Sequence, residues 1–357
     1  MDYNIKKSSW FIKAICFNFS ICFFVASFAA TVYLNLWGHV WKDFLKLMVL
    51  PGPLVTDYFM LGNIASAFLN AGICGMTFTL LMIMLKTECR PSYLAGYFLV
   101  VAHCFYGLNF LNMWPPVLGI LLFTKIFKIG FRHNLDMAMF STAFGPFISE
   151  MLFRYHVWDY YIGGIVQISF IGFVFVIIFS IFLGFAIPAM LPGALKLHKG
   201  FNLYNGGLAF GLLGLFIYAF MYKTFGITAP QATAFPNELY YAHGNSYQGF
   251  ITVYFILMFL LSILWGWFLN GRSFKGYEEL LKSNGHTADF FAEYGRAKVL
   301  INMGVYGLTV LAYFTLVVTL TDGAGFTGPT VGVIIAALTF SAQGQHPANV
   351  WSIFVGY

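Results

Sequence analysis

Long apolar runs separated by short polar connections extend along the whole chain. They lie at about residues 14–37, 58–85, 93–111, 115–131, 134–153, 160–190, 204–221, 250–268, 299–320 and 328–340. A helix needs about 20 apolar residues to cross the hydrocarbon core of a bilayer. The pattern therefore predicts an all-α integral membrane protein with about ten transmembrane helices. The first run is too long and too aromatic for a signal peptide, so we interpret it as a retained helix.

The composition supports a membrane protein and excludes several other classes. Hydrophobic residues make up 60% of the 357 positions and charged residues only 9%, whereas a soluble domain carries about 25% charged residues. The 19 Lys and Arg residues are scattered between apolar runs and form no basic face, so no nucleic-acid partner is expected. The 5 Cys residues show no CxxC or other metal spacing, and we predict neither a metal nor a cofactor.

The positions of the basic residues predict an orientation. With a cytoplasmic N-terminus, the basic residues expected outside are few, namely Lys42, Lys46, Arg154 and Lys223. Cytoplasmic connections of membrane proteins carry an excess of Lys and Arg. We therefore expect a cytoplasmic N-terminus and a cytoplasmic connection at residues 271–298, in which 277–282 is helical and Ser283-Asn284-Gly285 ends the helix.

A gapless offset of 213 residues relates two parts of the chain. Pro116, Gly119, His133 and Asp136 match Pro329, Gly332, His346 and Asn349. The count of spans gives both copies the same orientation, which predicts a parallel repeat and speaks against inverted repeats.

This repeat suggests a division into three parts. Residues 1–50 form a transmembrane helix followed by an interfacial helix at 38–50, which ends at Pro51-Gly52-Pro53. Residues 51–195 form the first repeat and 196–357 the second. At the same offset Gly145, Pro146 and Glu150 have counterparts only beyond Tyr357, so we expect the natural protein to continue for about 50 residues or more, one broken span and one full span.

Polar residues inside the predicted spans are the candidates for function, because a charge at the bilayer centre costs about 2.5–3.5 kcal/mol. Gly145-Pro146 predicts a broken helix near mid-chain, the arrangement with which many transporters build their sites. The neighbouring polar candidates are Ser141, Thr142, Ser149 and Glu150. The alternative is a proline kink whose carbonyls are satisfied by Ser141 and Thr142, with Glu150 directed outward.

Further candidates lie near the predicted ends of spans. His133, Asp136, His346 and Asn349 are expected at the inner mouth of a pathway. Asn202 and Asn205 open the span at 204–221, where they either cap a helix or coordinate a solute. His103, Asn63, Asn70 and Gln167 are interpreted as hydrogen-bonding residues between helices. Asn109 and Asn112 are placed with His103 on the third span.

No catalytic motif accompanies these residues. The chain contains no GxSxG, HExxH, P-loop or CxxC sequence. We therefore predict that the protein is not an enzyme.

Two motifs resemble an uncharacterised bacterial membrane-protein family, the domain of unknown function 1576. They are the stretch from His198 to Gly207 (HKGFNLYNGG) and the stretch from Gly344 to Asn349 (GQHPAN). The resemblance extends from about Pro51 onward. It implies a bacterial inner membrane and supplies no activity or substrate.

These observations together favour a transporter or channel for a small polar solute or ion. Its pathway would lie between the repeats, and Glu150 would carry a coupling proton if it is buried. The alternative is a membrane sensor or scaffold that acts through the 271–298 connection. The bilayer is the expected partner, and association into homo-oligomers is left open.

Overall fold

The computed structural model describes residues 2–51, 56–153, 161–162, 165–166, 168, 170–198, 205–224, 244–321 and 325–355. Helices joined by turns form this part of the chain, together with one antiparallel pair of two-residue strands, β1 (Tyr161–Ile162) and β2 (Ile165–Val166). Its helices confirm the prediction of an all-α, multi-pass membrane-like fold.

Six described helices are long and apolar enough to cross a membrane. They comprise Ser8–Tyr33, Ile64–Met84, Phe170–Leu191, Gly206–Thr224, Tyr247–Leu269 and Arg296–Thr321. Other predicted spans form shorter apolar helices, such as Trp114–Ile126, whose 13 residues extend only about 20 Å. The predicted count of about ten spans is therefore not confirmed.

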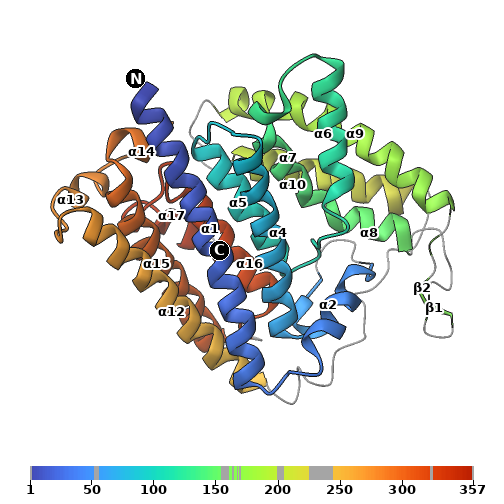
Figure 1. Cartoon of the computed structure of the whole chain (residues 1–357), viewed down its shortest axis with the longest axis horizontal. Helices are drawn as coiled ribbons and strands as arrows, with labels where there is room; N and C mark the ends of the chain where they lie inside the picture. Colours follow the sequence, from blue (N-terminus) through green and yellow to red (C-terminus); the bar gives the residue numbers. More distant parts are fainter. Residues whose placement is uncertain are drawn as a thin grey trace.

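The first part of the chain forms a unit of five helices, which we call unit one (Figure 1). It comprises α1 (Asp2–Tyr33), α2 (Val40–Met48), α3 (Tyr58–Leu61), α4 (Ile64–Met84) and α5 (Pro91–His103). The long helices α1 and α4 pack antiparallel, and Ser27 Oγ of α1 donates to the Ala65 carbonyl at the start of α4 (2.7 Å). Residues 104–112 follow α5 as a turn, here named the Asn109 turn.

The last part repeats this order, and we call it unit two. It comprises α12 (Gly244–Leu269), α13 (Tyr277–Leu280), α14 (Phe290–Glu293), α15 (Arg296–Thr321) and α16 (Gly328–Ala337), which continues as the 3-10 turn η4 (Leu338–Phe340). Again the two long helices pack antiparallel, and Ser262 Oγ of α12 donates to the Leu300 carbonyl near the start of α15 (3.0 Å). Residues 341–349 follow as the His346 turn, and α17 (Trp351–Val355) comes last.

The short helices of the two units begin in the same way. Asp57 caps α3 by accepting from the backbone N–H groups of the second and third residues that follow it, and Asp289 caps α14 identically, 232 residues later. The first N–H of each helix then donates to the turn of its own unit, from Tyr58 to the Phe105 carbonyl and from Phe290 to the Ala342 carbonyl, both at 3.1 Å.

The two units run in opposite directions. The N–H of Gly328, at the start of α16, donates to Asp57 Oδ1 beside the end of α5 (3.0 Å). Gln343 Nε2, just after α16, donates to the carbonyl of Pro91 at the start of α5 (3.0 Å). Helices α5 and α16 therefore lie side by side and antiparallel, and the units form an inverted repeat.

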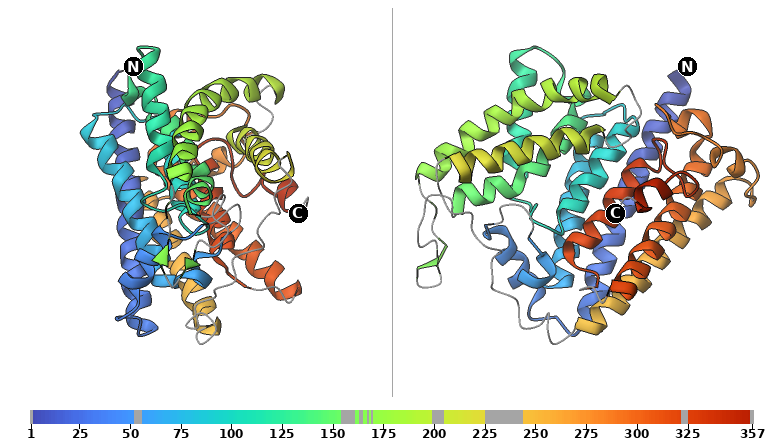
Figure 2. Two further views of the ribbon diagram at one scale, coloured as in Figure 1. Left: turned by 90° about the vertical axis from the view of Figure 1, so that its right-hand side faces the viewer. Right: turned by 180° about the vertical axis from the view of Figure 1, so that it is seen from behind.

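Elements α6 to α10 lie between the units in sequence and gather on the side of unit one that faces away from unit two (Figures 1 and 2). They are α6 (Trp114–Ile126), η1 (Phe131–His133), α7 (Leu135–Ser141), η2 (Thr142–Phe144), α8 (Gly145–Phe153), α9 (Phe170–His198), α10 (Asn205–Tyr218) and the π-helical η3 (Ala219–Thr224). Helices α6 and α9 cross in backbone contact at Gly119 and Gly184, where an added Cβ would lie 2.0 and 2.3 Å from a carbonyl oxygen.

The basic residues gather at one end of the molecule, which we call the cationic end. It holds the start of α1, the α4–α5 connection and the 271–298 connection (Figure 1). Its described basic residues include Lys13, Lys86, Arg90, Arg272, Lys275, Lys282, Arg296 and Lys298, whereas Lys42 and Lys46 lie on α2 at the opposite end. This segregation follows the charge pattern from which the orientation is predicted.

Candidate functional site

The Asn109 turn and the His346 turn have the same backbone design. Each has a glycine with a positive φ as its fourth residue, +127° at Gly107 and +116° at Gly344. Such angles favour glycine because it lacks a Cβ. In each turn an asparagine five residues later, Asn112 or Asn349, donates through Nδ2 to that glycine's carbonyl at 2.8 Å.

The same asparagine also accepts a bond and so closes each turn. Its Oδ1 receives the backbone N–H of Asn109 in one turn (2.8 Å) and of His346 in the other (3.0 Å). The two sequences are Gly-x-Asn-x-x-Asn and Gly-x-His-x-x-Asn, 237 residues apart.

This bonding gives a different correspondence from the repeat predicted at an offset of 213. That alignment pairs Asn349 with Asp136, but in the structure Asn349 corresponds to Asn112. Helices α6 and α16 do run in the same direction, as the span count predicted. The bonding of the turns, however, relates α16 to α5. The divisions at residues 51 and 196 stay a prediction.

A buried asparagine of the preceding long helix holds each turn in place. Asn70 Nδ2 on α4 donates to the carbonyls of Cys104 and Leu108 (3.0 and 2.8 Å). Asn302 on α15 does the same for the two corresponding carbonyls of the His346 turn, at 2.7 and 2.8 Å. Each amide satisfies two buried carbonyls outside the helix ladder, which would otherwise be costly.

The Asn109 turn packs against the broken helix formed by α7, η2 and α8. Asn112 Nδ2 donates to Ser149 Oγ on α8 (2.8 Å). An added Cβ at Gly107 would lie 2.8 Å from Pro146 Cγ, so the turn touches the proline ring. Asn109 Nδ2 donates to the Leu47 carbonyl at the end of α2 (3.0 Å). The turn therefore connects α2, α5 and α8 through polar contacts.

Glu150 lies inside the helical assembly beside this cluster. Its exposed fraction is 1%, and Oε1 accepts from the Tyr222 hydroxyl of η3 (2.6 Å). The alternative in which Glu150 is directed outward is therefore wrong. Burial follows from its place on α8, the face of which packs against α9.

Ser141 and Thr142 mark the break one turn before Gly145-Pro146. Their hydroxyls donate to the carbonyls of Ala138 and Met139, each at 2.7 Å. These bonds go to carbonyls near the end of α7 and not to the Thr142 carbonyl four residues before Pro146, and α8 restarts at Gly145 because proline fits the first turn of a helix.

The His346 turn packs against the 271–298 connection. His346 Nδ1 accepts the N–H of Ala348 (3.2 Å), which leaves the proton on Nε2, and Nε2 donates to the Ser283 carbonyl (2.9 Å). Burial lowers the pKa of His346 below its ordinary value, and the Ser283 carbonyl acts in the opposite direction. The ring also stacks on Phe290 with centroids 6.3 Å apart. The bonding therefore fixes a neutral imidazole in one tautomer.

The remaining predicted residues are placed as follows. His133 is exposed at the cationic end, where its Nε2 accepts from Arg132 Nε (2.9 Å). Asp136 accepts from Ser92 Oγ at the start of α5 (2.7 Å). Gln167, Asn202 and the side chain of Asn205 lie outside the described residues. Within the described part of the chain, no group of three or more His, Cys, Asp or Glu residues is arranged to hold a metal ion.

Several residues that form these turns were not predicted as site residues. Asn70 was interpreted as a hydrogen-bonding residue between helices, and Asn109 and Asn112 were only placed on the third span. Tyr58, Asn302 and Gln345 were not singled out. Tyr306 and Gln345 pair within unit two, while Tyr58 donates to the Gly107 carbonyl in unit one (2.9 Å). The signal that could have found them is the Gly-x-(Asn/His)-x-x-Asn motif that occurs after both short apolar helices.

The chain matches one family model. The model described as Protein of unknown function (DUF1576) matches residues 37–223 and 269–357, so the chain belongs to this family. No curated protein and no solved structure matches the chain.

Proposed function

We propose that this member of the DUF1576 family is a transporter that moves a small polar solute or ion across a membrane. The inverted repeat carries this proposal. Many secondary transporters consist of two inverted repeats whose relative rocking opens a central site to each side in turn. Broken helices with polar neighbours at the repeat interface are a second feature of such proteins, and α7, η2 and α8 match it.

Two hydrogen bonds are suited to act as alternating contacts between the units. At the cationic end Gln343 of unit two donates to Pro91 of unit one, and at the opposite end Gly328 donates to Asp57. They lie at opposite ends of the α5–α16 pair. Rocking about this pair would lengthen one bond while keeping the other, which would open one end at a time.

The predicted pathway residues divide between the two ends. Ser149, Glu150 and Pro146 accompany the Asn109 turn, while His346 and Asn349 form the turn at the cationic end. We assign to Glu150 the role of the coupling carboxylate, because it is the buried acid of the broken helix. Ser141, Thr142, His133, Asp136, Asn202 and Asn205 remain candidates for the rest of the pathway.

Crosslinking tests the rocking motion without knowledge of the solute. In a background lacking the five cysteines, one protein carries Asp57→Cys with Thr327→Cys and another carries Arg90→Cys with Gln343→Cys. We expect each crosslink to form and to abolish solute flux in proteoliposomes, with recovery on reduction. Full flux through either crosslinked protein would contradict the proposal.

A panel of small polar solutes and ions, measured as current across a supported proteoliposome layer, identifies the cargo. We expect Glu150→Gln to reduce the current at least tenfold while the protein remains folded. Glu293→Gln, on α14 in the 271–298 connection, is the matched control and should leave the current unchanged.

The alternative function is a sensor or scaffold that uses the 271–298 connection. This connection packs against the His346 turn of its own unit. The Phe290 N–H donates to the Ala342 carbonyl, and the Ser283 carbonyl accepts from His346. This packing favours a part in gating over a free docking segment. Two variants distinguish the functions. A phenotype in cells that carry a shortened connection, together with no phenotype in cells that carry Glu150→Gln, would favour the alternative.

We also propose a bacterial inner membrane with the cationic end in the cytoplasm. Lys282→Cys at the cationic end should react with an impermeant thiol reagent only after the cells are opened. Lys42→Cys at the opposite end, an exposed lysine like Lys282, should react in intact cells. The reverse result would overturn the orientation.

A further inference from the structure

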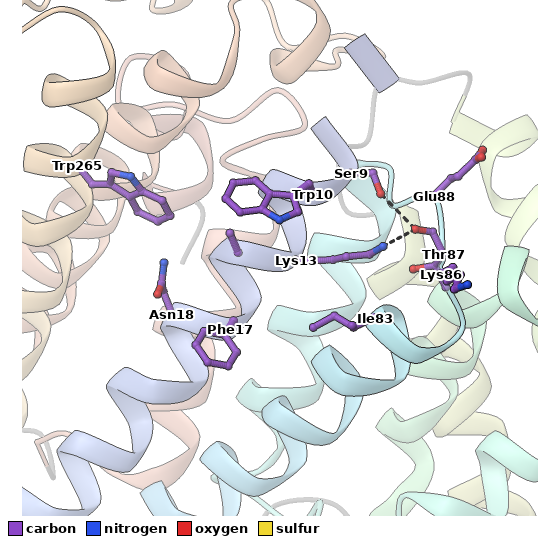
Figure 3. A pocket seen from close by; sticks show the side chains of 11 residues that line it. Ser9, Trp10, Lys13, Phe17, Asn18, Ile83, Lys86, Thr87, Glu88 and Trp265 are labelled. Carbon is purple, nitrogen blue, oxygen red and sulfur yellow. Dashed lines mark hydrogen bonds between the residues drawn. The ribbon is translucent and has the colours of Figure 1, made fainter. Parts of the chain in front are cut away.

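A groove crosses α1 at the cationic end, and its lining residues belong to neither of the two turns (Figure 3). Its volume is about 720 Å³, and its walls come from α1, the end of α4 with the following connection, and α12. The lining residues include Lys13, Lys86, Glu88, Trp10, Trp265 and Phe17. The groove thus combines basic, aromatic and apolar side chains at one end of membrane-crossing helices.

Lys13 is held in a fixed position inside the groove. Its Nζ donates to the Thr87 carbonyl (2.7 Å), which also accepts from Ser9 Oγ (3.2 Å). Figure 3 shows both bonds converging on Thr87. An ammonium group carries three N–H donors, so Lys13 retains donors for an anion after this bond is formed. Its long aliphatic stem is half-buried against the groove.

The charges of the groove favour an anionic occupant. Lys13 and Lys86 oppose the single carboxylate of Glu88, which leaves a net positive charge at the lining. Basic pockets between transmembrane helices on the cytoplasmic side are a recurrent type of lipid-headgroup site.

The apolar surroundings favour a lipid over a soluble anion. Trp10 is 68% exposed, and indole rings of this kind prefer the level of the headgroups. From Phe17 an exposed apolar stripe continues along α1 through Ile21, Val25 and Phe28. A phosphate bound at Lys13 would therefore have a continuous apolar surface beside it for its acyl chains.

We propose that this groove binds an anionic glycerophospholipid, with its phosphate at Lys13 and Lys86 and its acyl chains along the exposed face of α1. The site is separate from the proposed transport pathway. Glu88 lies at the rim and disfavours a second negative charge.

Native mass spectrometry of the full-length protein in detergent, titrated with phosphatidylglycerol or phosphatidylcholine, tests this proposal. We expect the wild type to prefer phosphatidylglycerol. Lys13→Gln combined with Lys86→Gln should weaken that binding about 30-fold, which corresponds to about 1 kcal/mol for each basic residue near a membrane surface. Lys42→Gln combined with Lys46→Gln, at the opposite end, is the matched control and should bind like the wild type.

Glu88→Gln provides a test with the opposite sign at an exposed position, where folding should be unaffected. Removal of the carboxylate should strengthen phosphatidylglycerol binding several-fold, by about the same term for one charge. Equal binding of the two lipids by the wild type would overturn the proposal. So would wild-type affinity in the double lysine variant, or an unchanged affinity in Glu88→Gln.

Discussion

The Asn109 turn and the His346 turn share one backbone design and differ in the side chain at the third position of its motif, Asn109 or His346. Asn109 cannot ionise in the physiological range, and its amide donates to the Leu47 carbonyl. His346 occupies the equivalent position and bonds the Ser283 carbonyl instead. The glycine and the last asparagine of each motif close the turn through their hydrogen bonds. The side chain at position 109 or 346 can therefore bond to the neighbouring segment, which differs between the two ends.

The surroundings of the two turns differ as well. The Asn109 turn contacts Ser149 and Pro146 of the broken helix, which belongs to the elements inserted between the units. The His346 turn contacts the 271–298 connection, which belongs to its own unit. The comparison shows how one inverted design acquires an imidazole in the turn at the cationic end and an amide in the turn at the opposite end.

Removal of the amide that anchors each turn should have the largest effect. Asn302→Leu and Asn70→Leu each leave two buried carbonyls without their donor, and each such group costs about 1–3 kcal/mol. We expect both to lower the free energy of unfolding by about 2 kcal/mol or more, measured by thermal unfolding in detergent. Asn18→Leu, at an exposed position, is the control and should change stability by less than about 0.5 kcal/mol.

Similar losses in Asn302→Leu and Asn70→Leu would support the equivalence of the two turns. A loss confined to one of them would contradict it.

Alanine at the two turn glycines should have a smaller and unequal effect. At Gly344 an added Cβ would lie 2.3 Å from the Gly285 carbonyl oxygen, while at Gly107 it would meet the edge of a proline ring at 2.8 Å. Positive φ adds strain at both, about 1–3 kcal/mol. Gly344→Ala should therefore destabilise more than Gly107→Ala in the same thermal measurement.

Gly271→Ala separates strain from steric contact, because Gly271 has a φ of +68° and nothing within 4 Å of an added Cβ. It should cost the least of the three. A cost equal to that of Gly344→Ala would show that the approach of Gly344 to Gly285 is unimportant.

The smallest effect should be a pH dependence that only the His346 turn shows. Because burial lowers the pKa of His346, the unfolded chain binds a proton more readily than the folded chain as the pH falls through about 6.5. Stability should therefore fall below that pH and be constant above it. A proton on Nδ1 would also remove the bond from Ala348, worth about 1 kcal/mol.

His346→Asn gives this turn the residue found at position 109 and removes the titrating group. The fall in thermal stability between about pH 7 and pH 5 should be smaller in this variant than in the wild type. An identical pH profile in both proteins would assign the dependence to other groups. Asn109→His tests the converse, and should introduce a fall on acidification at the opposite end.

The sequence by itself determined where the helices lie. Most apolar runs contain a described helix, although the run at 134–153 is divided between α7 and α8. The short helix α2 ends at Met48, before the predicted stop at Pro51. Helix α13 and its end before Ser283 were also predicted. These features depend on local composition and on proline and glycine, whose effects act within a few residues.

The tertiary structure alone decided which segments are equivalent. The offset of 213 matched prolines and histidines that have similar spacing, yet His133 is exposed and His346 is buried between a turn and a connection. The inverted repeat is defined by side-chain amides and carboxylates that bind backbone groups, such as Asn70 and Asn302 or Asp57 and Asp289. Every residue has a backbone carbonyl, so the sequence does not indicate which carbonyls accept these bonds. A repeat defined by such bonds can therefore be recognised only in the folded chain.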